Sequence, residues 1–494
     1  MNELDILFTE KDRTNVNPEF FSDMGLPCLK KLLNNNEYSV FADTLCKPLT
    51  DANLITERQN ILKDFVMYPD LLLKFQRICS EAQNNKFTIH ESVVSSSSSK
   101  RKLIENLSVT NKSLEVPAEL YNAMKYKSFS SRTLFDFFSE LSRTGMLDNI
   151  KHKINEMAGW LLNDRVSFDI QYGPSFKIKS AYAASEGYRS IPQKTHRGNK
   201  NKILPDPNEF EYYLNYLLDL QIGDLLNRGV VNMCSIISSI NSYILNFTKK
   251  LSMQLLFYTA AIKIMNYGDQ ISCSAVFPRL NSDKIKAKAL YDLGLLMTDG
   301  TVKGKVPNDF SEEDGFYIIS GVNQGGKTTF LKSIGIAQLF AQNGLPVFAD
   351  EYDCPVFKNL VSHFPKDEEE ALMYGKLAEE LERFHGSLSL MKENALVLLN
   401  ESFATTTEKE GCEIAKDVLR ALSKVRPSLL FVTHNYRLLQ NMKEISQTLE
   451  NGTRLHSLVV CAGNSSTDRT YTIKKGEPQK EIHGLEYVLN SIKG

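Results

Sequence analysis

Apolar residues recur every three or four positions along much of the first part of the chain, the spacing that places them on one face of a helix. This spacing predicts helices in four places: residues 55–65, residues 71–78, residues 134–141 and, as two long helices, residues 209–267. Residues 166–179 alternate instead in the manner of a β-strand. We therefore expect a mostly helical region of nearly 300 residues.

The last 200 residues show a different pattern, in which short apolar runs alternate with helical segments. The apolar runs lie at residues 316–319, 395–401 and 429–434, and helical patterns lie at residues 329–340 and 410–422. Such alternation is typical of an α/β domain built on a mostly parallel sheet. We find no internal repeat.

These patterns predict a multidomain chain. We expect an N-terminal helical part of a core at residues 1–115, a helical lever and core region at residues 116–290, and an α/β domain at residues 291–494. Within the second region, residues 166–205 are a candidate for a clamp-like insertion.

Two segments of the helical region have a biased composition. Five serines at residues 95–99, followed by Lys100, Arg101 and Lys102, predict a flexible surface loop. Residues 177–202 contain seven Lys or Arg and one acid. A solvated loop is the simpler interpretation, and a loop that contacts nucleic-acid phosphates would have the same composition. The candidates for such contacts are Lys194, Arg197, Lys200 and Lys202.

The overall composition is that of a soluble globular protein, with 494 residues, 42% hydrophobic and 24% charged, and a formal net charge of −1. Any nucleic-acid surface must therefore come from local clusters of charge. The eight cysteines are scattered without a CxxC pair, which favours reduced thiols in a cytoplasmic protein over a zinc site or disulfides. The acidic N-terminus shows no secretion signal.

One stretch could be mistaken for a membrane span. Residues 230–248 are uncharged over 19 positions, which is close to the length needed to cross a bilayer. The stretch contains several Asn and Ser and ends at Lys249 and Lys250. This favours a long packed helix with one wetter face, and no membrane contact is expected.

Residues 321–328, GVNQGGKT, form a complete GxxxxGK[ST] sequence between a strand-like run and a helical run, which is the context of a nucleotide site. Its glycines allow backbone N–H groups to point at phosphate oxygens, and the helix N-terminus adds positive potential. Lys327 should reach the β- and γ-phosphates, and the Thr328 hydroxyl should ligate magnesium. The predicted nucleotide-binding residues are Gly321, Val322, Asn323, Gln324, Gly325, Gly326, Lys327, Thr328 and Thr329.

Two further apolar runs end in polar residues. The first ends in Asn400 and Glu401. In a P-loop ATPase the first of these positions usually holds an Asp that orients magnesium, and the second a Glu that polarises the attacking water. Asn400 supplies no negative charge, so we expect weaker metal binding or slower turnover, whereas Glu401 keeps the catalytic position. His434 ends the other run, and its order after these motifs favours a γ-phosphate or water-sensing role over a structural one.

Three threonines, Thr405, Thr406 and Thr407, follow shortly after Glu401. Some of them are expected to cap the helix predicted at residues 410–422. Their position just beyond the catalytic strand also makes them candidates for a functional loop.

The motifs GVNQGGKTTFLK, LVLLNESFATTTEKEG and FVTHNYRL, in this order, resemble the ATPase domain of the MutS mismatch-repair family. Weaker similarity extends to VPND at residues 306–309, to PLTD at residues 48–51 with Arg58 and Gln59, and to residues 471–476 and 483–485. The resemblance is strong after residue 305 and weak before it.

This resemblance implies an ABC-like P-loop ATPase domain that uses ATP and Mg²⁺. It also implies a dimer, here expected to be a homodimer, in which Thr405, Thr406 and Thr407 act in trans on the ATP of the partner. The expected ligand is mismatched, branched or duplex DNA, held by a dimeric clamp in mismatch repair or recombination-related DNA metabolism.

The chain also departs from the family. Mismatch readers of the family insert a Phe and a Glu, spaced as Phe-x-Glu, from a separate N-terminal domain, and this chain begins nearly at the helical core. Its string Phe138-Ser139-Glu140 lies on an apolar helix face, and one such string is expected by chance. We therefore expect no mismatch-recognition domain, and no nuclease-like extension at the C-terminus.

Two other functions remain open. ABC-type ATPases carry an LSGGQ-like signature before the acidic strand, but residues 384–394, FHGSLSLMKEN, contain no such motif. A nucleotide-gated scaffold that binds a protein partner and hydrolyses ATP slowly is consistent with Asn400 and with the near-neutral charge.

Overall fold

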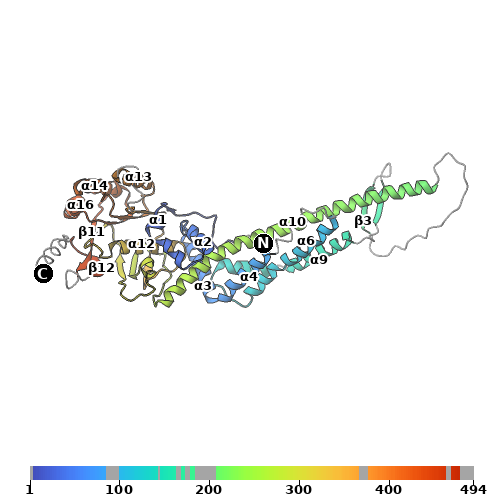
Figure 1. The fold of residues 1–494 in the computed structure, drawn as a ribbon, viewed down its shortest axis with the longest axis horizontal. Helices are drawn as coiled ribbons and strands as arrows, with labels where there is room; N and C mark the ends of the chain where they lie inside the picture. Colours follow the sequence, from blue (N-terminus) through green and yellow to red (C-terminus); the bar gives the residue numbers. More distant parts are fainter. Residues whose placement is uncertain are drawn as a thin grey trace. The chain divides into compact units, whose positions relative to one another are not determined.

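The computed structural model describes residues 4–84, 99–142, 145–162, 168–172, 178–183, 207–366, 376–462 and 469–478 (Figure 1). The chain divides into two compact units. The first contains Met1–Leu4, Asp70–Ser128 and Phe135–Ser252, and the second contains Asp5–Pro69, Phe129–Leu134 and Met253–Gly494. This grouping follows packing rather than chain order, so the three-part division at residues 115 and 290 stays a prediction.

The first unit is mainly helical in its described part. It contains most of α4 (Pro69–Asn84), α6 (Ser99–Ser113), α7 (Val116–Met124), most of α8 (Arg132–Ser142), α9 (Gly145–Leu162) and the first part of α10 (Pro207–Gln270). In α8, Leu134, Phe137 and Leu141 are buried, as the helical spacing predicted. Phe138 stacks on Tyr121 with ring centroids 5.2 Å apart, so packing accounts for this residue.

The strand-like pattern after residue 166 corresponds to two strands, β2 (Phe168–Tyr172) and β3 (Ile178–Ala183). They pair antiparallel, with Phe168 opposite Ala183. Strand structure is therefore confirmed for these residues. A clamp-like role for residues 166–205 stays a prediction, since residues 184–206 lie outside the described part.

Two predictions for the helical region were wrong. The pattern at residues 209–267 belongs to one continuous helix of 64 residues, α10, and not to two helices. No proline interrupts it, and internal glycines such as Gly223 cost about 1 kcal/mol each without ending a helix. Lys100, Arg101 and Lys102 lie in α6 rather than in a loop, because Lys and Arg are good helix formers. Residues 95–98 lie outside the described part.

Within α10, the segment Asn227–Gln270 is long and apolar enough to cross a membrane by length and composition alone, and 33% of its most apolar window is buried. Core helices of soluble proteins pass the same test. This finding is weak evidence for a membrane span.

A seven-stranded sheet forms the centre of the second unit, in the order β1, β8, β9, β10, β6, β11 and β12. These strands are β1 (Asn15–Val16), β8 (Asn359–His363), β9 (Ala395–Asn400), β10 (Ser428–Val432), β6 (Phe316–Ser320), β11 (Leu455–Ala462) and β12 (Arg469–Lys475). All neighbours pair in parallel except β11 with β12. The predicted mostly parallel α/β sheet is therefore confirmed.

Helices cover both faces of this sheet. Since alternate residues of a strand face opposite sides, Phe316 and Ile318 join one core, which is built with α13 (Lys376–Leu388), α14 (Glu408–Val425), α15 (Tyr436–Gln440) and α16 (Met442–Thr448). The other face meets α12 (Lys327–Gln342). A Cβ at Gly335 of α12 would lie 2.8 Å from Leu398, so this glycine permits the close approach of helix and sheet.

Smaller elements complete the second unit. A three-stranded antiparallel sheet is formed by β5 (Asn308–Ser311), β4 (Lys286–Leu290) and β7 (Glu351–Asp353). The remaining helices are α1 (Phe20–Asp23), η1 (Leu26–Lys31), α2 (Asn35–Leu45), α3 (Ala52–Met67) and α11 (Leu293–Leu296).

A buried arginine fixes the far end of α12. Arg58 on α3 is fully buried, and its Nη1 donates to Asn343 Oδ1 at 3.2 Å, where Asn343 is the residue that ends α12. Burial lowers the pKa of Arg58 to about 10, so it stays charged at neutral pH. A cation beside the carboxyl end of a helix is favourable, and this contact orients the helix whose other end begins at Lys327.

Candidate functional site

The phosphate loop connects β6 to α12, as its sequence context predicted. The helix begins at Lys327, directly after Gly326. Gly321 and Gly326 have φ angles of 123° and 93°, in the left-handed region that glycine adopts without strain. A Cβ at Gly321 would also approach Val460 to 3.1 Å. These two glycines are therefore required by the backbone path of the loop.

The amine of Lys327 lies inside the curl of this loop. Nζ donates to the carbonyl oxygens of Gly321 at 2.6 Å and Val322 at 2.9 Å, and the residue is only 5% exposed. The position holds a cation at the start of α12, where the N-terminal end of the helix also carries positive potential. Both features favour an anion.

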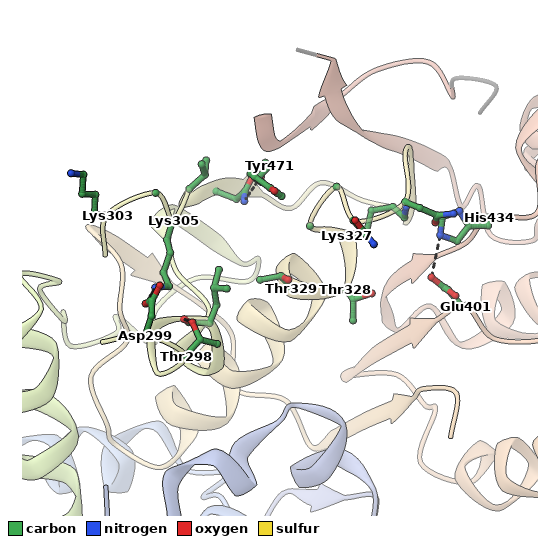
Figure 2. Close-up of a pocket in the computed structure, with 18 residues that line it drawn as sticks. Thr298, Asp299, Lys303, Lys305, Lys327, Thr328, Thr329, Glu401, His434 and Tyr471 are labelled. Carbon is green, nitrogen blue, oxygen red and sulfur yellow. Dashed lines mark hydrogen bonds and ion pairs between the residues drawn. The ribbon is translucent and has the colours of Figure 1, made fainter. Parts of the chain in front are cut away.

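Most of the predicted nucleotide-binding and catalytic residues line one pocket with a volume of about 450 Å³, which is within the usual range for small-ligand sites. In Figure 2, Lys327, Glu401 and His434 lie at one end of the pocket. Thr298, Asp299, Lys303 and Lys305 lie at the other end, and Thr328, Thr329 and Tyr471 lie between them. Asn323, Gln324, Gly325 and Gly326 also line the pocket. Gly321, Val322 and Asn400 are not among the lining residues.

The sheet topology explains why residues so far apart in sequence meet. The phosphate loop, Glu401 and His434 follow the neighbouring strands β6, β9 and β10, whose order is β9, β10, β6. Parallel strands end at the same edge of a sheet, and ligands of open α/β sheets bind at this edge. The three motifs are thus brought together as expected.

Glu401 and His434 contact each other directly, since Nε2 of His434 lies 3.1 Å from Oε1 of Glu401. The hydrogen bond from His434 lowers the pKa of Glu401, partial burial opposes this effect, and the charge of Lys327 adds to the lowering. Glu401 is therefore ionised at neutral pH. An ionised carboxylate that faces the pocket can accept a proton from a water molecule.

Thr328 and Asn400 form a second pair. The Thr328 hydroxyl donates to Asn400 Oδ1 at 2.9 Å, and Asn400 is only 5% exposed. Oxygen ligands of this kind suit Mg²⁺, so the pair fits the cation that accompanies a nucleoside triphosphate. The pair carries no formal charge, unlike a Thr and Asp pair.

The three threonines are engaged within their own chain. Thr405 donates to Glu380 Oε2, and Thr406 donates to Glu410. Thr407 is the N-cap of α14, since its hydroxyl accepts the N–H of Glu410 at 3.3 Å. The capping role expected for this group is thus confirmed for Thr407. A role on the ATP of a partner chain stays a prediction.

Sequence reasoning missed the other end of the pocket. Thr298, Asp299 and Lys305 come from the loop after α11, where Lys305 forms an ion pair with Asp299. Tyr471 comes from β12, and its backbone has a left-handed φ of 55°. Asn308 holds this backbone, because its Nδ2 donates to Tyr471 O at 3.1 Å and its Oδ1 accepts the N–H of Ile473 at 2.7 Å. The family-like segments at residues 306–309 and 471–476 were the available signal.

The four basic residues considered for DNA contacts, Lys194, Arg197, Lys200 and Lys202, lie outside the described residues. Within the described part of the chain, no group of three or more His, Cys, Asp or Glu could hold a metal ion.

Both the α/β part and the helical part of the chain match known protein families. Residues 317–490 match the family MutS domain V, and residues 50–270 match the MutS2 N-terminal domain. The Endonuclease MutS2 of Streptococcus uberis is 29% identical over 172 residues, which cover 34% of this chain and 21% of the relative. The DNA mismatch repair protein MutS of Thermus aquaticus is 34% identical over 133 residues, which cover 27% of this chain and 16% of the relative.

The Endonuclease MutS2 of Streptococcus mutans is 29% identical over 171 residues, which cover 31% of this chain and 22% of the relative. The matched part thus spans about a fifth of the length of these curated relatives. One family covers the α/β part and the other covers most of the helical part. Together with the order of the three nucleotide motifs, these matches show that the chain belongs to the MutS family.

Proposed function

We propose that this chain is an ATP-dependent DNA-binding protein of the MutS type, in which ATP binding and hydrolysis control a dimeric DNA clamp in mismatch repair or recombination-related DNA metabolism. The observation that carries the proposal is the pocket that unites the phosphate loop with Glu401 and His434. The site contains a cation, N–H groups and a carboxylate in the arrangement that triphosphate hydrolysis needs.

The pocket has two chemically different ends, which supports one orientation of the nucleotide. The triphosphate belongs at the end with Lys327, because the loop N–H groups and the start of α12 are found there. To reach a phosphate, Lys327 must exchange its contacts with loop carbonyls for phosphate oxygens. The nucleoside then extends toward Asp299 and Lys305, and Tyr471 offers an aromatic face to the base.

In this proposal each residue of the site has a separate chemical role. Thr328 and Asn400 would hold Mg²⁺, which would supply positive charge to offset the charge of the phosphates. Glu401 orients and deprotonates the attacking water, and His434 holds the Glu401 carboxylate and senses the γ-phosphate. A second candidate function, a nucleotide-gated scaffold with slow turnover, is favoured by the uncharged Asn400.

Replacing Asn400 with Asp tests whether the uncharged amide weakens the metal site. The variant should lower the Mg²⁺ concentration needed for half-maximal ATP hydrolysis by about tenfold, because a new negative charge beside a divalent cation would supply at least the ~1.4 kcal/mol that tenfold requires. The measurement is ATPase activity across a magnesium titration. Asn122→Asp, at an exposed position of the first unit, is the matched control. An unchanged magnesium dependence would argue against Asn400 as a metal ligand.

The site is further proposed to be completed by a second copy of the chain. Thr405, Thr406 and Thr407 follow Glu401 at the same edge of the sheet, where a partner could present its nucleotide to them. ATP binding would then close a homodimer in the cytoplasm, and hydrolysis would reopen it. A preparation that stays monomeric at saturating ATP and micromolar concentration would contradict this part of the proposal.

DNA binding is tested by a filter-binding titration with homoduplex, mismatched and four-way-junction DNA, each with and without ATP. We expect binding through phosphate contacts, for which Lys194, Arg197, Lys200 and Lys202 are candidates. The affinity should therefore fall steeply with salt, with a logarithmic slope of roughly −0.9 per neutralised phosphate. ATP should change the affinity. Absence of DNA binding at low salt would overturn the proposed function.

A further inference from the structure

A buried carboxylate on α13 holds the loop that follows Glu401. Glu380 is 4% exposed, and its Oε1 accepts the backbone N–H of Phe403 at 2.6 Å. Its other oxygen, Oε2, accepts the hydroxyl of Thr405. Hydrogen bonds to a carboxylate are about twice as strong as neutral ones, and burial excludes competing water. One side chain thus fixes both the backbone and the first threonine of this loop.

The loop needs such a restraint because its backbone is strained. Glu401 and Phe403 have φ angles of 49° and 67°, in the left-handed region that costs a non-glycine residue roughly 1–2 kcal/mol. The N–H of Glu401 is held by Val432 O at 2.8 Å. Glu401 is therefore fixed on its N-terminal side by the sheet and on its C-terminal side by the contacts of Phe403.

A buried histidine supports the same loop from β8. Nδ1 of His363 lies 2.8 Å from Ser402 Oγ, and burial lowers the pKa of His363 to about 4, so its ring is neutral at pH 7. The ring lies near Phe384 and Phe403, with centroids 5.3 Å and 6.2 Å apart. Phe384 and Phe403 also pack edge to face, with ring centroids 5.0 Å apart, so aromatic packing supports the loop as well.

We propose that Glu380 is a positioning residue for ATP hydrolysis, because it holds Glu401 in the strained conformation in which the Glu401 carboxylate meets His434 and faces the nucleotide. It also holds Thr405 at a fixed place beside the site. This inference rests on the proposed function, since it assigns Glu380 to the same reaction. Glu380 itself touches neither the pocket nor the nucleotide.

Three variants test the proposal on the full chain. Glu380→Ala removes both contacts and should lower kcat by about 10- to 100-fold, since small displacements of a catalytic group have costs of this size. The affinity for a non-hydrolysable ATP analogue should change by less than about threefold, because the phosphate loop is untouched. Glu380→Gln can accept from Phe403 and donate to Thr405, so it should recover most of kcat. Glu382→Ala, exposed on the same helix, is the control and should behave as the wild type.

Amide hydrogen exchange provides a readout that does not depend on hydrolysis. Glu380→Ala should speed exchange in residues 401–407 and leave residues 321–330 unchanged. Wild-type kcat and unchanged exchange in Glu380→Ala would overturn the inference, as would equal losses of kcat and nucleotide affinity. If Glu380→Ala does not fold, Thr405→Val can be used, because it removes one of the two contacts of Glu380. A wild-type kcat in Thr405→Val together with a fully inactive Glu380→Gln would then overturn the inference. A wild-type chain that binds no ATP would instead contradict the proposed function. Amide exchange in residues 401–407 would still show whether Glu380 holds this loop.

Discussion

Replacing Lys327 with alanine is expected to weaken ATP binding by at least about 100-fold. Lys327 is the cation at the phosphate end of the pocket, and its amine lies within the loop formed by Gly321 and Val322. Each charge-assisted hydrogen bond to a phosphate is worth about 1.5–3 kcal/mol, and the lysine can contact two phosphates. No other residue of the described pocket can take its place, since Lys303 and Lys305 lie at the opposite end.

The measurement is an equilibrium titration of the variant with a fluorescent ATP analogue in the presence of Mg²⁺. Lys358→Ala is a suitable control, because Lys358 is exposed in the same unit and lies outside the pocket. Thermal unfolding of both variants shows whether the fold is retained. A folded Lys327→Ala variant with wild-type affinity would place the nucleotide somewhere else.

Replacing Glu401 with glutamine is expected to lower turnover by about 10²- to 10⁴-fold, the range associated with loss of a general base. The side chain is nearly isosteric, and an amide can still contact His434, so the geometry of the pair should persist. The pKa of Glu401 is lowered chiefly by its hydrogen bond with His434, so the wild-type carboxylate is ionised at neutral pH and has a free position for the proton of water. Glutamine cannot accept this proton.

The decisive comparison for Glu401→Gln is between hydrolysis and binding. Phosphate release should fall by the stated factor, and ATP affinity should stay within about threefold of the wild type. Glu413→Gln, exposed on α14, is the control for loss of one negative charge. Hydrolysis at the wild-type rate would show that another group activates the water.

The sequence was sufficient for the parts of the site that depend on local patterns. The GxxxxGK[ST] string predicted the turn into α12, and two buried runs, one ending in Asn400 and Glu401 and the other in His434, predicted two strands that deliver polar groups. These predictions succeeded because a buried strand needs a continuous apolar run and a phosphate loop needs glycines at set positions. The order of the three motifs then indicated a resemblance to the ATPase domain of the MutS family.

The parts that failed or were missed depend on contacts between distant residues. Residues 15–16 carry no apolar pattern, yet they add a parallel strand beside Asn359 of β8. Glu380 and His363 resemble ordinary helix and strand residues in sequence, and only packing shows that they hold the loop after Glu401. The pattern at residues 209–267 did not show that α10 is one continuous helix, and its internal glycines weaken the helix without ending it.

Asn400 stands where P-loop ATPases usually carry an Asp, and this difference bears on the proposed hydrolysis of ATP. The Thr328 hydroxyl donates to Asn400 Oδ1, so the amide occupies the place of the missing carboxylate without its charge. The side chain at position 400 therefore fills the expected place, but the metal site carries less negative charge than one with an Asp there. We therefore expect slow ATP hydrolysis. Nucleotide binding and the restraint of the loop after Glu401 should contribute more to the function than rapid turnover.

We propose that one pocket of this chain, completed by the threonine loop of a second copy, binds and hydrolyses ATP. Mixing the Lys327→Ala and Thr406→Ala variants distinguishes this shared site from a site within one chain. A mixed dimer pairs the intact phosphate loop of the Thr406 variant with the intact threonine loop of the Lys327 variant. We expect ATPase activity in the mixture clearly above that of either variant alone, at a level near one active site per mixed dimer. A mixture no more active than the separate variants would contradict it.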